Sequence, residues 1–217
     1  MQISKRLKSL AYLVESDDVI ADIGCDHALL DIYLIKNNIV SKCLISDINE
    51  SALKSGIDNI KKYHLEKYID VKLGDGIETI TNDINTLIIS GMGSSSICKI
   101  LDNPKIKQIN KLIIESNNDY YLLRSYICSK GFYISYEEVI YDKGKYYVNI
   151  VFLKGYREYS KIELKYGPIL IKNSNKEYFN YLYKLNNNIL NNIPKYKLFL
   201  RIKINKDNFI LKILKRK

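Results

Sequence analysis

Residues 19–27 read Val19-Ile20-Ala21-Asp22-Ile23-Gly24-Cys25-Asp26-His27. A short apolar run that ends at a glycine is typical of a buried strand, and the polar residues behind the glycine are typical of a loop. A helix is expected directly afterwards, over residues 27–37. Strand, glycine turn and helix in this order indicate the first unit of an α/β fold with a parallel sheet.

The same unit recurs after this stretch, and one further helix precedes it. Further strands are expected at residues 43–47, 69–73, 86–90 and 111–115, and further helices at 3–14, 50–62, 94–102 and 119–130. Two alternating runs, 132–141 and 145–153, predict a closing antiparallel hairpin. The predicted fold class is therefore α/β, with a sheet that is parallel except for its C-terminal hairpin and covered by helices on both faces. Five such units and a closing hairpin resemble the Rossmann-like sheet of class I methyltransferases.

Positive charge is concentrated in the last third of the chain. Residues 1–153 carry 18 Lys+Arg and 20 Asp+Glu, a net charge of −2, whereas residues 154–217 carry 16 and 4, a net charge of +12. We expect a ligand-binding domain at 1–155 and a small basic, partly helical domain at 156–217. A helix is predicted over 174–192, while 196–217 fits a helix or a hairpin. The asymmetry favours a polyanion such as RNA, with compositional drift as the alternative.

Several classes of protein are excluded by what the sequence does not contain. No apolar run approaches the roughly 18 residues of a membrane span, so we expect a cytoplasmic protein without a membrane partner. The cysteines at 25, 43, 98 and 128 form no C-x-x-C pair and match no common zinc spacing. Free thiols and no metal site are expected.

Acidic residues and glycines stand where four of the predicted strands end. Asp22 and Gly24 close the first strand, Asp47 the second, Asp75 the third and Gly91 the fourth. Because the carboxyl ends of parallel strands share one edge of a sheet, these residues are expected to gather at one ligand site. The predicted cofactor-binding residues are Asp22, Gly24, Cys25, Asp47, Ile48, Asp75, Gly76, Gly91 and Met92.

Each of these residue types suits a nucleoside that carries an amino acid. Gly24 has no Cβ and lets the backbone approach a ligand closely. Asp47 would accept hydrogen bonds from two ribose hydroxyls, and Asp75 from the amino group of an adenine. Asp22 would hold an ammonium group, directly or through water. The predicted cofactor is S-adenosyl-L-methionine.

A nicotinamide dinucleotide is the competing ligand for such a sheet. Dinucleotide sites need G-x-G-x-x-G, whose extra glycines let a pyrophosphate rest on a helix N-terminus. Here Asp26 and His27 follow Gly24, and a carboxylate at that place would repel a pyrophosphate. S-adenosyl-L-methionine has no phosphate and carries a positive sulfonium, so the acidic loop favours methyl transfer.

The motifs resemble a known family. Residues 22–30, Asp22-Ile23-Gly24-Cys25-Asp26-His27-Ala28-Leu29-Leu30, are similar to the D-I-G-x-D-H-A-x-L signature of bacterial tRNA (adenine(22)-N1)-methyltransferases of the TrmK type. Gly91-Met92-Gly93 resembles that family's G-M-G-G, and Ser4-Lys5-Arg6-Leu7 and Gly167-Pro168 also match. The resemblance implies methyl transfer to N1 of an adenine in tRNA, at position 22 near the D-loop, by a Rossmann-like domain followed by a helical domain that helps to hold tRNA.

The chain departs from the family pattern at three places. Asp31 stands where a proline normally follows the first motif, and Ser94 replaces the fourth glycine of G-M-G-G. The Q-P-N after the fifth strand appears as Glu115-Ser116-Asn117, in the region expected to hold the target base.

Three residues are the candidates for catalysis. Asp26 would stabilise the cationic methylated adenine and accept from its amino group, or would be a helix N-cap. His27 would carry a proton, or would be a structural histidine bonded to backbone. Asn117 would bind the base edge, or order a turn beside Asn118. Tyr146 and Tyr147 suit base stacking or, more simply, packing of the hairpin.

Two other functions fit the same sequence. One is an enzyme of this fold that methylates a small molecule or a protein. The other is a non-catalytic RNA-binding relative that kept the fold and lost the chemistry. The basic segment favours a tRNA substrate over a small molecule or a protein.

Overall fold

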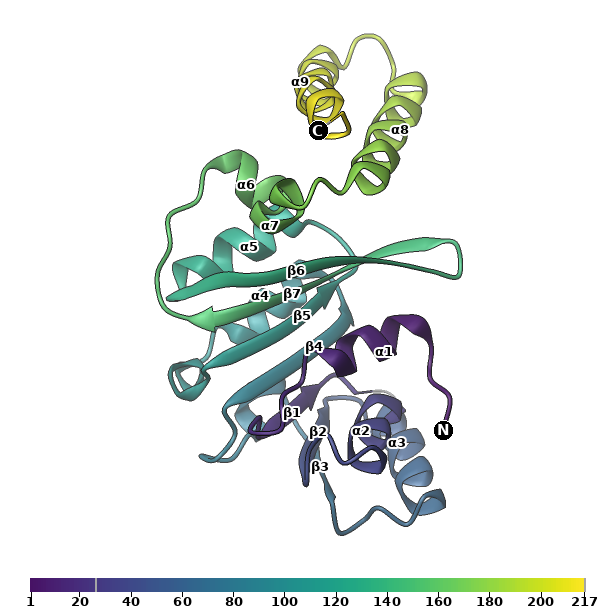
Figure 1. Ribbon diagram of the computed structural model, residues 1–217, viewed down its shortest axis with the longest axis vertical. Coiled ribbons are helices and arrows are strands. Elements are labelled where there is room, and N and C mark those ends of the chain that lie inside the picture. The colour runs from purple at the N-terminus through teal and green to yellow at the C-terminus, as the bar shows by residue number, and fades with distance from the viewer. Residues whose placement is uncertain (26, 217) are drawn as a thin grey trace. The chain divides into compact units, whose positions relative to one another are not determined.

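A seven-stranded sheet forms the centre of the structure, a computed structural model that describes residues 1–25 and 27–216 (Figure 1). The strands are β1 (Ile20–Ile23), β2 (Cys43–Asp47), β3 (Ile69–Leu73), β4 (Thr86–Met92), β5 (Lys111–Ser116), β6 (Phe132–Asp142) and β7 (Lys145–Lys154). Their order across the sheet is β3-β2-β1-β4-β5-β7-β6. Strands β1 to β5 are parallel, and β7 is antiparallel to both of its neighbours. This confirms the predicted sheet and its closing hairpin.

Helices cover both faces of the sheet. Figure 1 shows α1 (Lys5–Tyr12), α2 (Leu29–Lys36) and α3 (Glu50–Lys62) on one face, and α4 (Ser94–Leu101) and α5 (Tyr120–Ser129) on the other. Two short 3-10 helices, η1 (Gly76–Thr79) and η2 (Pro104–Gln108), were not predicted because one turn leaves no periodic pattern. The predicted strands and longer helices of this region are confirmed, with bounds that differ by a few residues at most.

Local signals in the sequence explain where the helices begin. The side chains of Ser4, Asn49 and Asp119 accept hydrogen bonds from the backbone of the first turns of α1, α3 and α5. These are the residue types preferred as N-caps, since each satisfies a backbone N–H that has no partner in the helix. Helix α2 differs, because Ala28 at its N-cap is left-handed, with φ +53°, and offers no side-chain cap.

The chain divides into two compact units, Met1–Lys165 and Tyr166–Lys217. The first unit reaches past the predicted boundary at residue 155 because its last residues are bonded to the sheet domain. The Tyr159 hydroxyl accepts from the backbone N–H of Ile134 at 2.9 Å. Arg124, buried in an ion pair with Glu137 at 2.7 Å, donates to the carbonyls of Leu164 and Lys165 in α6 (Lys161–Tyr166).

The second unit consists of α7 (Pro168–Lys172), α8 (Lys176–Asn192) and α9 (Leu198–Leu214). Residues 198–214 are thus a helix, which settles the choice that the sequence left open. Phe179 of α8 and Leu211 of α9 are buried, and Asn208 donates to the Asn187 side chain at 2.9 Å. Arg201 donates to the carbonyls of Leu190 and Ile193, which closes the C-terminal end of α8. Over the described ranges, none of the helices is long and apolar enough to cross a membrane.

Candidate functional site

A cavity of about 320 Å³ opens at the carboxyl ends of β1 and β4. This is the edge of the sheet where the ligand site was predicted. Five of the predicted site residues line it, namely Asp22, Gly24, Cys25, His27 and Gly91. Six residues that were not predicted as site residues complete the described lining, namely Arg6, Leu7, Ala28, Leu29, Leu30 and Ser90.

The loop after β1 is fixed by backbone geometry around Gly24. The N–H groups of Gly24 and Cys25 both donate to the Ser46 carbonyl of β2, at 2.7 and 3.3 Å. Gly24 has φ +78°, and a Cβ at this position would lie 1.8 Å from the Met92 methyl group. The glycine is therefore required by its left-handed backbone and by the Met92 side chain that covers it. Met92 contacts Gly24 but is not itself among the described residues that line the cavity.

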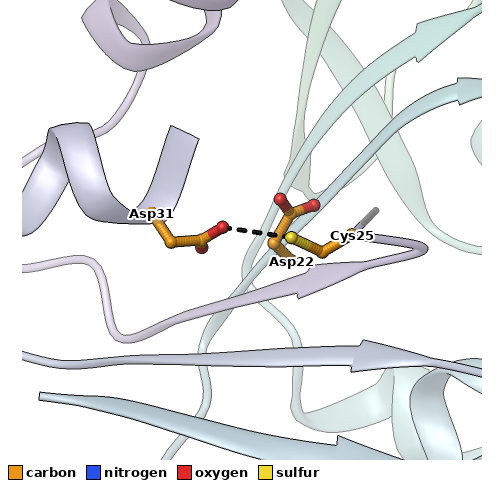
Figure 2. A group of neighbouring side chains, drawn as sticks. All are labelled: Asp22, Cys25 and Asp31. Carbon is orange, nitrogen blue, oxygen red and sulfur yellow. Dashed lines mark hydrogen bonds between the residues drawn. The ribbon is translucent and has the colours of Figure 1, made fainter. Parts of the chain in front are cut away.

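A buried carboxylate cluster lies at the wall of the cavity (Figure 2). Asp22 is 6% exposed and Asp31, in the first turn of α2, is 0% exposed. The Cys25 thiol donates to Oδ2 of Asp31 at 3.3 Å, while Oδ1 of Asp31 has no hydrogen-bond partner. Burial raises the pKa of Asp31 to about 6. Burial also raises the pKa of Asp22 well above its usual range, and the neighbouring Asp31 carboxylate raises it further.

Asp47 and Ile48 lie beside this loop, at the end of β2. Oδ1 of Asp47 accepts from the Asn49 backbone at 2.7 Å, so the carboxylate also shapes the turn into α3. The Asp47 carbonyl accepts from the Gly74 N–H at 3.1 Å, which joins this strand end to the next one. Ile48 is 71% exposed. Neither Asp47 nor Ile48 is among the described residues that line the cavity.

Asp75 and Gly76 stand at the end of β3. The Asp75 side chain is exposed and belongs to a second, more open hollow with Lys72 and Thr79. Gly76 has φ +53°, and a Cβ there would lie 2.8 Å from a methyl group of Ile100 in α4. Packing against α4 therefore accounts for this glycine, whichever ligand Asp75 meets.

Hydrogen bonds join the loops after β4 and β5. Asn117 donates from its backbone to the Met92 carbonyl at 2.8 Å and from its side-chain amide to the Gly91 carbonyl at 2.5 Å. The hydroxyls of Ser94 and Ser116 are hydrogen-bonded at 2.8 Å, and Ser94 also donates to the Asn118 carbonyl at 2.6 Å. Ser94 and Ser116 both depart from the family motifs. The two residues that differ from the motifs therefore share one hydrogen-bonded contact.

The third departure in this region, Glu115, forms an ion pair with Arg6 of α1. The Glu115 side chain is fully buried, and burial raises its pKa while the Arg6 guanidinium opposes that rise. Arg6 also lies over the Tyr147 ring, 5.1 Å from its centroid, and its backbone N–H donates to Asp142 at 3.1 Å. These contacts hold Arg6 at the cavity. The sequence could have suggested Arg6, since it precedes Leu7 on the inward face of α1.

The predicted catalytic residues are placed only in part. Asp26 lies outside the described residues, so its role stays a prediction. The His27 side chain is exposed and lines the cavity, and its carbonyl accepts from Asn59 at 3.0 Å. The Tyr146 ring contacts that of Tyr141, with centroids 4.8 Å apart. Together with the Arg6–Tyr147 contact, this favours hairpin packing for the two tyrosines over base stacking.

The donor set of the cavity fits S-adenosyl-L-methionine. A buried carboxylate at Asp22, backed by an acceptor oxygen of Asp31 without a partner, provides a place for an ammonium group. The same carboxylates would repel a pyrophosphate. The acidic Asp31 in the first turn of α2 also disfavours a phosphate at this helix N-terminus, which argues against a dinucleotide.

Comparisons with known proteins identify the family of this chain. A family described as "Methyltransferase domain" matches residues 3–150. The tRNA (adenine(22)-N(1))-methyltransferase of Bacillus subtilis (strain 168) is 31% identical over 184 residues, covering 81% of this chain and 77% of its own.

Two solved structures with bound ligands are also similar. The structure of M. capricolum TrmK in complex with S-adenosyl-homocysteine is 31% identical, with a TM-score of 0.81, covering 99% of this chain and 100% of its own. A Streptococcus pneumoniae protein in complex with S-adenosyl-L-methionine is 26% identical, with a TM-score of 0.90 and the same coverage. From the matched domain, the sheet order and these similarities, the chain belongs to the TrmK-type tRNA (adenine(22)-N(1))-methyltransferase family.

Proposed function

We propose that this chain transfers a methyl group from S-adenosyl-L-methionine to N1 of adenine 22 in tRNA. The observation that carries the proposal is the cavity at the ends of β1 and β4, lined by the buried carboxylate of Asp22. A relative named for this reaction, at 31% identity, supports the choice of tRNA and of the atom methylated. The proposed place of action is the cytoplasm, where the tRNA substrate is found.

The strand ends would hold the different parts of the cofactor. Asp22 accepts from the ammonium group, Asp47 from the ribose hydroxyls and Asp75 from the adenine amino group. The turns at Gly24 and Gly91, both with positive φ, bring backbone close to the ligand. When bound, S-adenosyl-L-methionine supplies an electrophilic methyl group on a sulfonium.

Methylation at N1 requires an exposed base. N1 lies on the Watson–Crick edge, so the adenine must leave its stack, at a cost of a few kcal/mol that is smallest in a loop. Its lone pair then needs no strong base before attack, and most of the acceleration comes from positioning the reactants. Asn117 donates to Gly91, which leaves its amide oxygen to accept from the adenine amino group.

The methylated ring is a cation, and a carboxylate beside it stabilises the transition state that leads to it. Asp26 is the proposed carboxylate, with His27 at the adjoining part of the cavity. The three departures from the family motifs are compatible with retained chemistry. Ser94 and Ser116 bond to each other, Glu115 is paired with Arg6, and Asp31 is held by Cys25.

The second unit supplies the charge for tRNA. Residues 166–217 carry 12 Lys+Arg and 2 Asp+Glu, a net charge of +10. Lys195, Lys197, Lys203 and Lys206 are exposed there. Phosphate contacts from such residues give affinity without reading sequence, so the choice of base is left to the first unit.

Methyl transfer to two transcripts tests the proposal. A tRNA transcript with adenine at position 22 should accept label from radioactive S-adenosyl-L-methionine, and the same transcript with guanine at that position should not. Equal labelling of both would place the reaction elsewhere. No labelling of either, with cofactor binding intact by calorimetry, would favour a small-molecule or protein substrate or a non-catalytic RNA-binding relative.

A further inference from the structure

Two buried carboxylates from different elements lie together at the wall of the cavity. Asp22 belongs to β1 and lines the cavity, whereas Asp31 belongs to α2 and is not among its described lining residues. The side-chain ligand atoms of Asp22, Cys25 and Asp31 lie within 4.8 Å of one another (Figure 2). Two carboxylates this close and this deeply buried are not both charged at neutral pH, because each disfavours the ionised form of the other.

Among the described residues, the groups around the pair provide no compensating positive charge. The Cys25 thiol donates to Asp31, and the Cys43 thiol of β2 faces the same carboxylate. Arg6 of α1 attracts Asp22 electrostatically, but its guanidinium is paired with Glu115. The Asp70 carboxyl group of β3 acts on the Cys43 thiol and brings no positive charge to the pair. In residues 1–25 and 27–216, no lysine or arginine forms an ion pair with Asp22 or Asp31.

A buried oxygen of Asp31 without a hydrogen-bond partner indicates that the pair holds a proton. Its Oδ1 is fully buried and has no hydrogen-bond partner, which is costly for an ionised carboxylate. A proton shared between Asp31 and Asp22 removes one negative charge and gives this oxygen a hydrogen-bond partner. Burial raises the pKa of both groups, Asp31 to about 6, which agrees with a shared proton near neutral pH.

We propose that Asp31 makes cofactor binding depend on pH: it shares one proton with Asp22, and that proton is released to solvent when the cofactor's ammonium group meets Asp22. This inference rests on the proposed placement of the ammonium at Asp22. Asp31 is a positioning residue, since it acts through Asp22 and does not itself line the cavity. Asp31 stands where the family motif that this chain resembles has a proline, and a proline side chain holds no proton.

The sign of the pH effect follows from the charges. A cation beside Asp22 favours the ionised pair, so binding lowers the pKa of the pair and releases up to one proton. Affinity for the cofactor therefore rises with pH over the range in which the free pair keeps its shared proton, and it levels off only above the pH at which the free pair loses that proton. In the steep part of the range, one released proton changes the dissociation constant about tenfold per pH unit.

Calorimetry measures this release directly. S-adenosyl-L-methionine is titrated into the full-length protein at pH 5.5, 6.5 and 7.5, in two buffers with different enthalpies of ionisation. The dependence of the heat on the buffer gives the number of protons released. 5′-Methylthioadenosine, which has the nucleoside but no ammonium group, is the matched ligand. We expect proton release and pH-dependent affinity with the first ligand and neither with the second.

Two variants separate Asp31 from the rest of the protein. Asp31→Asn keeps the shape and an acceptor for Cys25 but removes the second carboxylate, so proton release should fall and the affinity profile should move to lower pH by about one unit. Asp83→Asn, in an exposed loop before the amino end of β4, should leave both unchanged. Unfolding temperatures compare the folding of the three proteins.

The outcomes are distinct. Buffer-independent heats with S-adenosyl-L-methionine, or equal proton release with both ligands, would overturn the role of the pair in the protein without any substitution. An unchanged pH profile in folded Asp31→Asn would overturn the role of Asp31. Absence of cofactor binding at every pH would instead overturn the proposed function, and this inference with it.

Discussion

Neutralising four lysines of the second unit should lower the affinity for tRNA by about 100-fold or more at low salt, because each phosphate contact contributes up to roughly tenfold through counterion release. The residues are Lys195, Lys197, Lys203 and Lys206, all exposed, changed together to glutamine. The logarithm of affinity falls linearly with the logarithm of salt, with a slope of about −0.7 to −0.9 per phosphate neutralised. The variant should therefore show a slope shallower by roughly three.

Arg201 is left unchanged in this variant for a structural reason. Its guanidinium donates to the carbonyls of Leu190 and Ile193 at the end of α8, so its removal would disturb the helix as well as the charge. A matched variant neutralises Lys54, Lys61, Lys62 and Lys67, four exposed lysines of the first unit. Fluorescence binding over a salt series compares the two. An equal loss of tRNA affinity in both variants would show that the second unit binds tRNA no better than other basic surface. Compositional drift would then explain its charge.

Changing Asp47 should weaken cofactor binding without disturbing the cavity. Losing a charge-assisted hydrogen bond costs about 1.5–3 kcal/mol, which corresponds to about 10- to 150-fold in the dissociation constant. Asp47→Asn is the preferred change, since an amide oxygen still accepts from the Asn49 backbone while the charge is lost. Isothermal titration with S-adenosyl-L-methionine measures the effect.

The control for Asp47 is Asn49→Ala. Asn49 caps α3 by accepting from the Ser51 N–H at 2.9 Å, so its removal loosens the same turn without touching the carboxylate. If Asp47 binds the ribose, Asn49→Ala binds the cofactor nearly as well as the unchanged protein. Equal weakening in both variants would show that Asp47 acts by ordering the turn, and unchanged binding in Asp47→Asn would remove it from the site.

The sheet was predictable because its signals are local. Each parallel strand is an apolar run closed by a glycine or an acid, and β2 and β3 have the predicted bounds. The end of the second unit was harder to predict, because the pattern of apolar residues over 198–214 fits a helix as well as a hairpin. Only packing against the rest of the unit decides between the two. Leu211 and Leu214 face the core of the second unit, whereas Phe199 and Phe209 of the same helix are exposed.

The parts of the site that the sequence missed depend on contacts between distant segments. Arg6 and Glu115 are 109 residues apart, and nothing near either predicts the pairing. An acid in the first turn of a helix is ordinarily explained by the helix dipole, which would have placed Asp31 at the surface. Its burial depends instead on Cys25 and Asp22, which the turn at Gly24 brings against α2. Close packing against α4 also explains why position 76 is a glycine, and this explanation involves no ligand.

Methylation at N1 of adenine 22 leaves a product nucleoside that can be identified. A tRNA transcript is incubated with the protein and S-adenosyl-L-methionine, digested to nucleosides and analysed by mass spectrometry against standards of 1-methyladenosine and N6-methyladenosine. Primer extension on the intact product locates the modified base, since a methyl group at N1 blocks pairing. We expect 1-methyladenosine and a primer-extension stop caused by position 22. Methylation on N6, on another base or at another position would contradict this expectation.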